Sequence, residues 1–319
     1  MGIRWKKKLF KGLLFFFAAQ LICVSLSITA SAEGTNNVKD SGVSIESLTT
    51  ESATEQKTTE QITTEAVPVV KENPGIRIKI GKKKKATKRY KGSFKKKKGE
   101  VYFRCRDKAD RKKFKGGFFT CGKYVYHCDK KGRLDRGWKK LGGQYYYFDR
   151  DNGKMAVSKT VDHIKIDKYG NPKNLKKDKA RIQTYIRARR IMESVTKPTD
   201  SKSTKLYKCY KWMEKLYYNQ YRTFDEGYKK YPKDWDVVFA NDIFKKHQGC
   251  CVSEAAAFAY MAKECGYKNV SICSDTGHAW TDIDGRLYDP LFAEAKEFDK
   301  NYNSSYWDYR SNPSIKKRL

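Results

Sequence analysis

A cysteine, a histidine and an aspartate occur near the end of the chain in the order that a nucleophile, its base and the orienter of that base require. Cys251 follows Gly249 by two positions, His278 lies in Gly-His-Ala-Trp, and Asp289 precedes a proline. In thiol-dependent acyl transfer, the histidine takes the proton of the cysteine and the carboxylate fixes the tautomer of the histidine. The three residues therefore predict attack on an amide carbonyl.

The residues after Gly249 predict a helix over 251–265, because a stripe of small apolar side chains recurs there at helical spacing. Gly249 can start this helix with an unusual backbone angle, and Gly266 can end it as a C-cap. Cys251 then lies at the helix N-terminus, where unpaired N–H groups and the positive end of the helix dipole favour a thiolate. We therefore expect the pKa of Cys251 to be lowered.

Three short strands are predicted after this helix, over 270–273, 278–283 and 286–289. The Asp-Gly pair at 284–285 joins the last two strands as a two-residue hairpin loop. We expect Ile283 to pair with Arg286. In this register His278 and Asp289 are diagonal neighbours, with Cα atoms about 7–8 Å apart, and one hydrogen bond can join their side chains.

The residues that lie near Cys251 and His278 in the sequence allow several interpretations. Cys250 could form a vicinal disulfide with Cys251, or it could be a small buried residue. His247 with the two cysteines could suggest a zinc site, but no second pair at metal-ligand spacing is present, so we expect no metal and no cofactor. Trp280 is expected to shield the imidazole from water. The backbone N–H of Cys251 is a candidate oxyanion donor.

The motifs resemble those of the transglutaminase-like superfamily, which has a papain-like core. Its pattern is Gly-x-Cys-x-x-x-Ala at a helix start, a Gly-His-Ala-Trp strand and an aspartate before proline. The matching residues are 249–255, 277–280 and 289–290. The resemblance extends over 175–319 and implies Cys251 as nucleophile, His278 as base and Asp289 as orienter. Because the superfamily includes cross-linking transferases, proteases, amidases and inactive members, the resemblance implies no single reaction.

Amphipathic helices are predicted ahead of the cysteine helix, over 178–195, 203–221 and 234–246. With the cysteine helix and the strands that follow it, they predict an α+β domain at 175–319, long enough to bury a core.

The N-terminal third predicts export. Residues 1–32 have a basic start, an apolar run and an Ala-x-Ala site, which are typical of a signal peptide. Residues 33–75 read as a disordered linker, because 33–74 are rich in Thr, Ser and Glu, with eight acidic and three basic residues. We expect a secreted chain with no lipid anchor, no C-terminal anchor and no stable membrane insertion, so its attachment to a cell wall must be non-covalent.

Basic residues dominate the next segment. The whole chain has a formal net charge of +33, and residues 76–115 contain twenty basic and three acidic residues. The lysine-rich part, 76–100, is expected to attract polyanions. The polyanions available to an exported chain are teichoic-type wall polymers, anionic headgroups and extracellular nucleic acid. Of these, a teichoic-type wall polymer is the expected partner rather than nucleic acid. The alternative is a solvated arm with no dedicated partner.

Residues 101–174 repeat imperfectly, as short aromatic strands that alternate with Gly-containing turns. Such hairpins are expected to stack into a small β-solenoid, with Cys128 in the apolar position that Phe148 occupies in the next copy. The stretch 137–149 resembles cell-wall or choline/glucan-binding repeats, which implies that aromatic residues bind carbohydrate or teichoic polymer. The candidate binding residues are Trp138, Tyr145, Tyr146 and Tyr147. The alternative is that the hairpins form a spacer.

Export permits disulfides, although their connectivity cannot be derived from the sequence. Cys265 and Cys273 could pair, as could members of a set formed by Cys105, Cys121 and Cys128. We expect Cys251 to remain unpaired.

The leading prediction is a secreted, wall-associated thiol enzyme that acts on amide bonds of a protein or peptide, with water or an amine as acyl acceptor. One alternative is a non-catalytic surface binding protein that keeps the same core as a scaffold. Another is a polyanion binder that works through residues 76–115.

Overall fold

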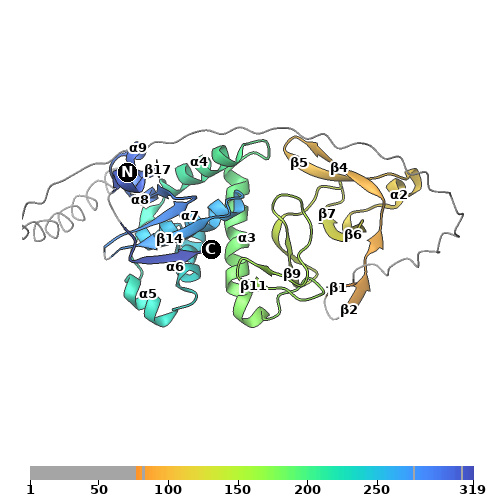
Figure 1. The fold of residues 1–319 in the computed structure, drawn as a ribbon, viewed down its shortest axis with the longest axis horizontal. Coiled ribbons are helices and arrows are strands. Elements are labelled where there is room, and N and C mark those ends of the chain that lie inside the picture. The colour runs from red at the N-terminus through yellow and green to blue at the C-terminus, as the bar shows by residue number, and fades with distance from the viewer. Residues whose placement is uncertain (1–76, 81–82, 276, 310–311) are drawn as a thin grey trace, which may run out of the picture. The chain divides into compact units, whose positions relative to one another are not determined.

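The computed structural model describes residues 77–80, 83–275, 277–309 and 312–319. All of them lie within Asn73–Leu319, which forms one compact unit. The predicted signal peptide at 1–32 and the predicted linker at 33–75 fall outside the described residues. Figure 1 shows the fold and labels many of the elements used below. Within this part of the chain, no helix combines the length and the apolar character that crossing a membrane requires.

The C-terminal region is built around one buried helix. The helices are α3 (Leu175–Val195), α4 (Lys202–Met213), α5 (Phe224–Lys230), α6 (Trp235–Lys246) and α7 (Cys251–Glu264). Nearly every side chain of α7 is buried. Its run of alanines lets α3, α6 and strand β15 (Ala279–Ile283) approach closely. The predicted helix over 251–265 is confirmed, and Gly266 ends it with a φ of 99°.

An antiparallel sheet covers α7, with its strands in the order β17-β16-β15-β14-β18. The other strands are β14 (Val270–Ser274), β16 (Arg286–Tyr288), β17 (Tyr302–Ser304) and β18 (Ile315–Arg318). Ile283 pairs with Arg286, as the Asp-Gly loop predicted. Short helices α8 (Pro290–Ala295), α9 (Phe298–Asn301) and α10 (Tyr306–Tyr309) connect the last strands. The mixed α and β architecture is confirmed.

One predicted helix is shorter than expected. The pattern over 203–221 predicted a continuous helix, but α4 ends at Met213. The aromatic pair Tyr217–Tyr218 forms strand β12, which pairs in parallel with β13 (Gln248–Gly249). Strand pairing replaces helix here because successive tyrosines favour extended backbone. The consequence is that β12 anchors the segment immediately before Cys251.

The repeat region consists of successive β-hairpins. They are β4 (Gly92–Lys97) with β5 (Glu100–Cys105), β6 (Gly117–Cys121) with β7 (Tyr124–Cys128), β8 (Gly137–Leu141) with β9 (Gln144–Phe148), and β10 (Thr160–Val161) with β11 (Ile164–Lys165). Ahead of or between them lie β1 (Arg77–Ile80), β2 (Lys83–Ala86), β3 (Lys88–Arg89) and α2 (Lys108–Lys113). Backbone hydrogen bonds link successive hairpins, from Leu134 N to Val101 O and from Met155 N to Val125 O.

The repeated aspartates hold the turns between hairpins. In each of three turns, an aspartate carboxylate accepts two backbone N–H groups. The acceptors are Asp129 (from Lys131 and Arg133), Asp149 (from Asp151 and Asn152) and Asp167 (from Tyr169 and Asn171). Each of these aspartates stands three or four residues before the glycine of its turn, at Gly132, Gly153 and Gly170. Cys128 packs in an apolar cluster with Phe103 and Phe119, as its alignment with Phe148 predicted.

Candidate active site

The backbone of His278 is fixed by a tight turn that follows β14. Asp275 Oδ1 accepts hydrogen bonds from Gly277 N at 2.8 Å and from His278 N at 2.7 Å. Ser274 Oγ donates to the carbonyl of His278 at 2.9 Å. The turn thus positions His278 directly before β15, which begins one residue later than predicted.

A buried hydrogen bond joins the histidine to the aspartate. His278 Nε2 donates to Asp289 Oδ2 at 2.6 Å, and the two residues are 9% and 0% exposed. The second carboxylate oxygen of Asp289 accepts Phe292 N at 3.1 Å and so caps α8. Because Nε2 is engaged by the carboxylate, Nδ1 is the ring nitrogen left to exchange a proton.

The aromatic neighbour of the imidazole is not the one that the sequence predicted. Phe292 stacks on His278 with ring centroids 3.9 Å apart and an interplanar angle of 7°. Trp280 instead packs with Cys273 and Leu287, and its indole N–H donates to Tyr306. The prediction assumed that side chains alternate between the two faces of a strand that begins at His278. In the structure His278 lies in the turn before β15, so this alternation does not apply to it. Phe292 is therefore the residue that shields the imidazole.

Two adjacent cysteines occupy the N-terminus of α7. Cys250 is the N-cap and is buried, whereas Cys251 is the first helical residue and is half-buried. Gly249 precedes them, and a Cβ there would lie 2.4 Å from the Cβ of Ser253. Position 249 thus requires glycine because a larger residue would clash with Ser253, and not because the backbone adopts an unusual angle. Asn219 N donates to Gly249 O at 2.9 Å and ties β12 to this helix start.

The interaction between the two adjacent thiols moves their pKa values in opposite directions. Donation from Cys251 lowers the pKa of Cys250 to about 6, although burial opposes the shift. The same hydrogen bond, together with burial and the nearby charge of Asp289, holds the pKa of Cys251 well above its usual value. The expected lowering at Cys251 is therefore wrong, because the sequence argument considered the helix dipole without the neighbouring thiol.

Other contacts bring the cysteine helix and the histidine strand together. Thr281 Oγ1 on β15 donates to the carbonyl of Ala255 in the first turns of α7 at 2.8 Å. The charge of Asp289 is one cause of the raised pKa of Cys251. Both cysteines are free thiols, which excludes the vicinal disulfide in this structure.

Tyr218 lies beside the cysteines, a placement that the sequence did not reveal. It is half-buried on β12, opposite Gly249. Burial and the neighbouring charges of Cys251 and Cys250 raise the pKa of Tyr218 to about 12, so its hydroxyl keeps its proton. A protonated phenol at this position can donate a hydrogen bond to a developing oxyanion.

Among the described residues, no three His, Cys, Asp or Glu side chains are grouped closely enough to hold a metal ion. His247 ends α6 with a left-handed φ of 56°, and its ring lies 6.1 Å from that of Trp212.

The four aromatic residues predicted to bind wall polymer are all buried. Trp138, Tyr145, Tyr146 and Tyr147 are 1%, 3%, 0% and 5% exposed. Trp138 Nε1 donates to Asp162 at 3.0 Å, and Tyr147 OH accepts from Arg150 at 2.9 Å. Three of the four belong to the same core cluster as α3 and α7. Their aromatic surfaces pack inside the protein in this structure, and none of the four presents an open binding face.

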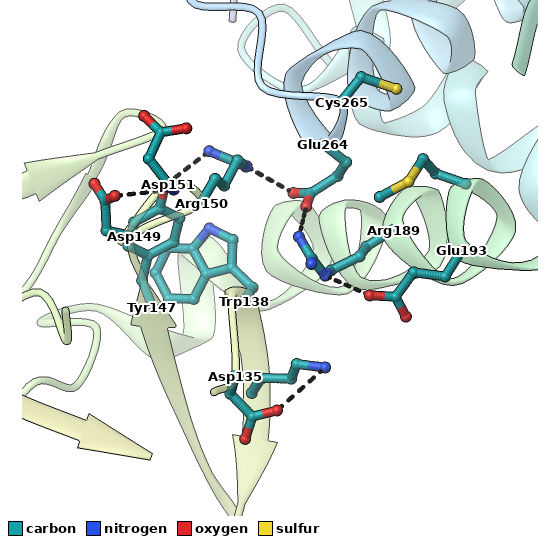
Figure 2. Close-up of polar contacts among 12 residues, drawn as sticks. Asp135, Trp138, Tyr147, Asp149, Arg150, Asp151, Arg189, Glu193, Glu264 and Cys265 are labelled. Carbon is teal, nitrogen blue, oxygen red and sulfur yellow. Dashed lines mark hydrogen bonds and ion pairs between the residues drawn. The ribbon is translucent and has the colours of Figure 1, made fainter. Parts of the chain in front are cut away.

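Arg150 links the repeat region to the end of α7. Figure 2 shows its guanidinium reaching Glu264, which also contacts Arg189 of α3. Arg150 Nη2 lies 2.9 Å from Asp162 and 2.7 Å from Glu264, and Arg189 Nη1 lies 3.0 Å from Glu264. The Glu264 side chain is 0% exposed and that of Asp162 is 4% exposed. These ion pairs and hydrogen bonds take the place of water around the buried carboxylates of Asp162 and Glu264.

No protein-family model matches this chain, and no curated protein matches it. Among solved structures, it is similar to the choline binding domain of Spr1274 of Streptococcus pneumoniae, with 21% identity, 26% of this chain and 95% of that chain covered, and a TM-score of 0.23. CbpJ of the same species has 20% identity, 31% and 41% coverage, and a TM-score of 0.18. Choline binding protein F, also from this species, has 21% identity, 31% and 40% coverage, and a TM-score of 0.17. Similarities of this size assign no function to this chain.

Proposed function

We propose that this chain is a thiol enzyme that acts on amide bonds at the outer surface of the cell that exports it. The observation that carries the proposal is the buried hydrogen bond of 2.6 Å between His278 Nε2 and Asp289 Oδ2, at the end of the sheet that covers the cysteine helix. Burying a polar imidazole–carboxylate pair costs solvation free energy. We infer that the protein keeps this pair because it has a functional role. The proposal includes membership of the transglutaminase-like superfamily, on the motifs around Cys251, His278 and Asp289.

The proposed reaction needs four proton movements. The Cys251 thiol passes its proton to Nδ1 of His278, and its sulfur attacks the amide carbonyl carbon. His278 then gives the proton to the leaving amine as the C–N bond breaks, which leaves an acyl thioester on Cys251. Water or a second amine then attacks the thioester and loses a proton to His278, which returns it to the sulfur of Cys251 as the C–S bond breaks. Asp289 stabilises the imidazolium at each stage.

Cys250 supports this role by accepting a hydrogen bond from Cys251. The lowered pKa of Cys250, about 6, favours its thiolate near neutral pH. Since Cys251 is the more exposed of the two, its sulfur is the one that a substrate reaches.

The experiment that tests the function uses the exported protein, isolated cell walls and a labelled primary amine. Mass spectrometry should detect either new amide bonds that contain the amine or fragments released from wall-linked peptides. Release of fragments alone assigns hydrolysis, and incorporation of the amine assigns transfer. If the protein changes neither wall peptides nor added protein substrates, the enzymatic proposal fails.

We also propose Tyr218 as the side-chain oxyanion donor. Tyr218→Phe is expected to lower kcat about 100-fold with little change in KM, since a donor to the oxyanion acts in the transition state. Tyr217→Phe is the matched control, because Tyr217 is the neighbouring residue and is 54% exposed. Equal activity of the two variants would remove Tyr218 from the mechanism.

A second candidate function is surface binding, with the C-terminal region as a scaffold. The specific observation that favours it is the row of exposed lysines on β4 and its turn, 95–98. Such a row attracts polyanions over a distance set by salt screening. The raised pKa of Cys251 also fits a domain without activity.

Replacing Lys95, Lys96, Lys97 and Lys98 with glutamine is expected to weaken binding to isolated walls or teichoic-type polymer several-fold at low salt, with a smaller loss at high salt. The control removes the same number of charges from exposed lysines near α3, at Lys173, Lys176, Lys177 and Lys179. Sedimentation of the protein with walls measures both variants. An equal loss from both would mean that net charge, and not this row, drives binding.

A further inference from the structure

Two buried cysteines from different helices lie with their sulfur atoms in contact. Cys209 Sγ on α4 and Cys265 Sγ at the C-cap of α7 are 3.9 Å apart, although 56 positions separate them in the sequence. Cys209 is 0% exposed and Cys265 is 9% exposed. Both belong to the main core cluster, which holds their helices in place.

We propose that Cys209 and Cys265 are an oxidative modification site and form a disulfide when the folded protein meets a disulfide oxidant. A disulfide requires the two sulfurs to approach within about 2.05 Å. Rotation of the two side chains can close the gap, because the sulfurs already contact each other across a packed helix pair. The sequence predicts export, and disulfides persist in such compartments.

The proposed oxidation of Cys209 and Cys265 is a thiol–disulfide exchange, in which atoms and electrons balance. Cys265 is the partly accessible thiol, so its thiolate attacks one sulfur of the oxidant, forms a mixed disulfide and releases the first thiolate. Cys209 then loses its proton and attacks the sulfur of Cys265, which forms the internal bond and releases the second thiolate. The two cysteines are oxidised, the oxidant is reduced to two thiols, and the two protons lost by the cysteines match those that the released thiolates take up.

The surroundings predict a slow first step. The hydrogen bond to Cys209 holds the pKa of Cys265 well above its usual value, with burial and the charge of Glu264 acting in the same direction and Lys205 opposing them. Figure 2 shows Cys265 next to Glu264, at the end of the helix that carries Glu264. Little thiolate is therefore present at neutral pH. Oxidation is expected over hours with a small oxidant.

This pairing replaces the one that the sequence suggested. Cys273 lies on the other face of the sheet, where its sulfur is 3.7 Å from Tyr306 OH and packs with Trp280. Cys265 belongs to the core on the α7 side. The strand that carries Cys273 thus directs its sulfur away from Cys265. The proximity of α4 to the end of α7 could not be seen from the sequence.

The test incubates the full-length folded protein with oxidised glutathione, blocks remaining thiols with an alkylating agent in denaturant, and maps peptides without reduction. The expected result is a linked peptide pair that contains Cys209 and Cys265 and is lost on reduction. If both cysteines are recovered alkylated, or either is linked to a different cysteine, the proposal is wrong.

A thermal measurement gives an independent readout. Closing a loop of this length is expected to raise Tm by about 10 °C relative to the reduced protein. Cys209→Ser should abolish this difference, and Cys273→Ser should keep it. If Cys209→Ser does not fold, Cys265→Ser is measured in its place. A Tm difference that persists without Cys209 or Cys265 would overturn the proposal.

Discussion

Cys251→Ser is expected to lower the rate of amide cleavage or acyl transfer by about 10⁴-fold or more, because a serine hydroxyl is a far weaker nucleophile than a thiol in a site built for sulfur. His278→Ala is expected to give a loss of similar size, and the double variant should lose little more than either single one, since the two groups act as a unit. Steady-state kinetics on the substrate found with cell walls measures each variant.

Two further variants make this result specific. Cys121→Ser changes a half-exposed thiol in the repeat region and should leave the rate unchanged. Cys250→Ser removes the partner of Cys251 but not the proposed nucleophile, so its loss should be smaller than that of Cys251→Ser. If Cys250→Ser abolishes activity and Cys251→Ser does not, the nucleophile is Cys250, whose pKa is the lowered one.

Arg150→Met is expected to destabilise the protein by about 3–5 kcal/mol, because it leaves buried carboxylates without their main cation. Asp162 loses its charged partner outright, and Glu264 keeps only Arg189. Urea or thermal unfolding followed by circular dichroism measures the loss. Arg133→Met is the matched control, since its side chain is 52% exposed and its contacts with Asp129 and Glu100 are at the surface. That variant should change stability by about 0.5 kcal/mol or less.

The pH dependence of the Arg150→Met effect has a definite sign. Burial alone would raise the pKa of Asp162, but the charge and hydrogen bonds of Arg150 outweigh burial and lower it. A depressed carboxyl pKa contributes stability above its unfolded value, and that contribution is lost as pH falls through the folded value. The difference in unfolding free energy between wild type and Arg150→Met should therefore shrink as the solution is acidified below about pH 4. A difference that stays constant down to acid pH, or a cost no larger than that of Arg133→Met, would contradict the role given to Arg150.

The local part of the fold follows from the sequence. The alanine-rich stripe after Gly249 predicts α7, and the Asp-Gly loop predicts the pairing of Ile283 with Arg286. Both signals come from neighbouring residues, so no long-range information is needed. The bond between His278 and Asp289 follows from the same short hairpin.

Contacts between distant segments do not follow from local patterns. Strand β18 joins the sheet beside β14, and Arg150 meets Glu264 across 114 positions. Burial of Tyr145, Tyr146 and Tyr147 was also beyond the sequence, because an aromatic strand has the same pattern whether it faces a ligand or a neighbouring helix. The pKa of Cys250 is lowered and that of Cys251 is raised because of how their side chains are oriented. The spacing of residues in the sequence does not reveal this orientation.

The most direct test of the proposed thiol site is the rate of labelling by iodoacetamide as a function of pH, read for each cysteine by peptide mass spectrometry. We expect the pair formed by Cys250 and Cys251 to be labelled first, at a rate that rises as pH passes through about 6, the pKa of Cys250. Asp289→Asn should slow this labelling and leave that of Cys121 unchanged. The contradictory result is slow, uniform labelling of all described cysteines that becomes appreciable only near the ordinary thiol pKa of about 8.5.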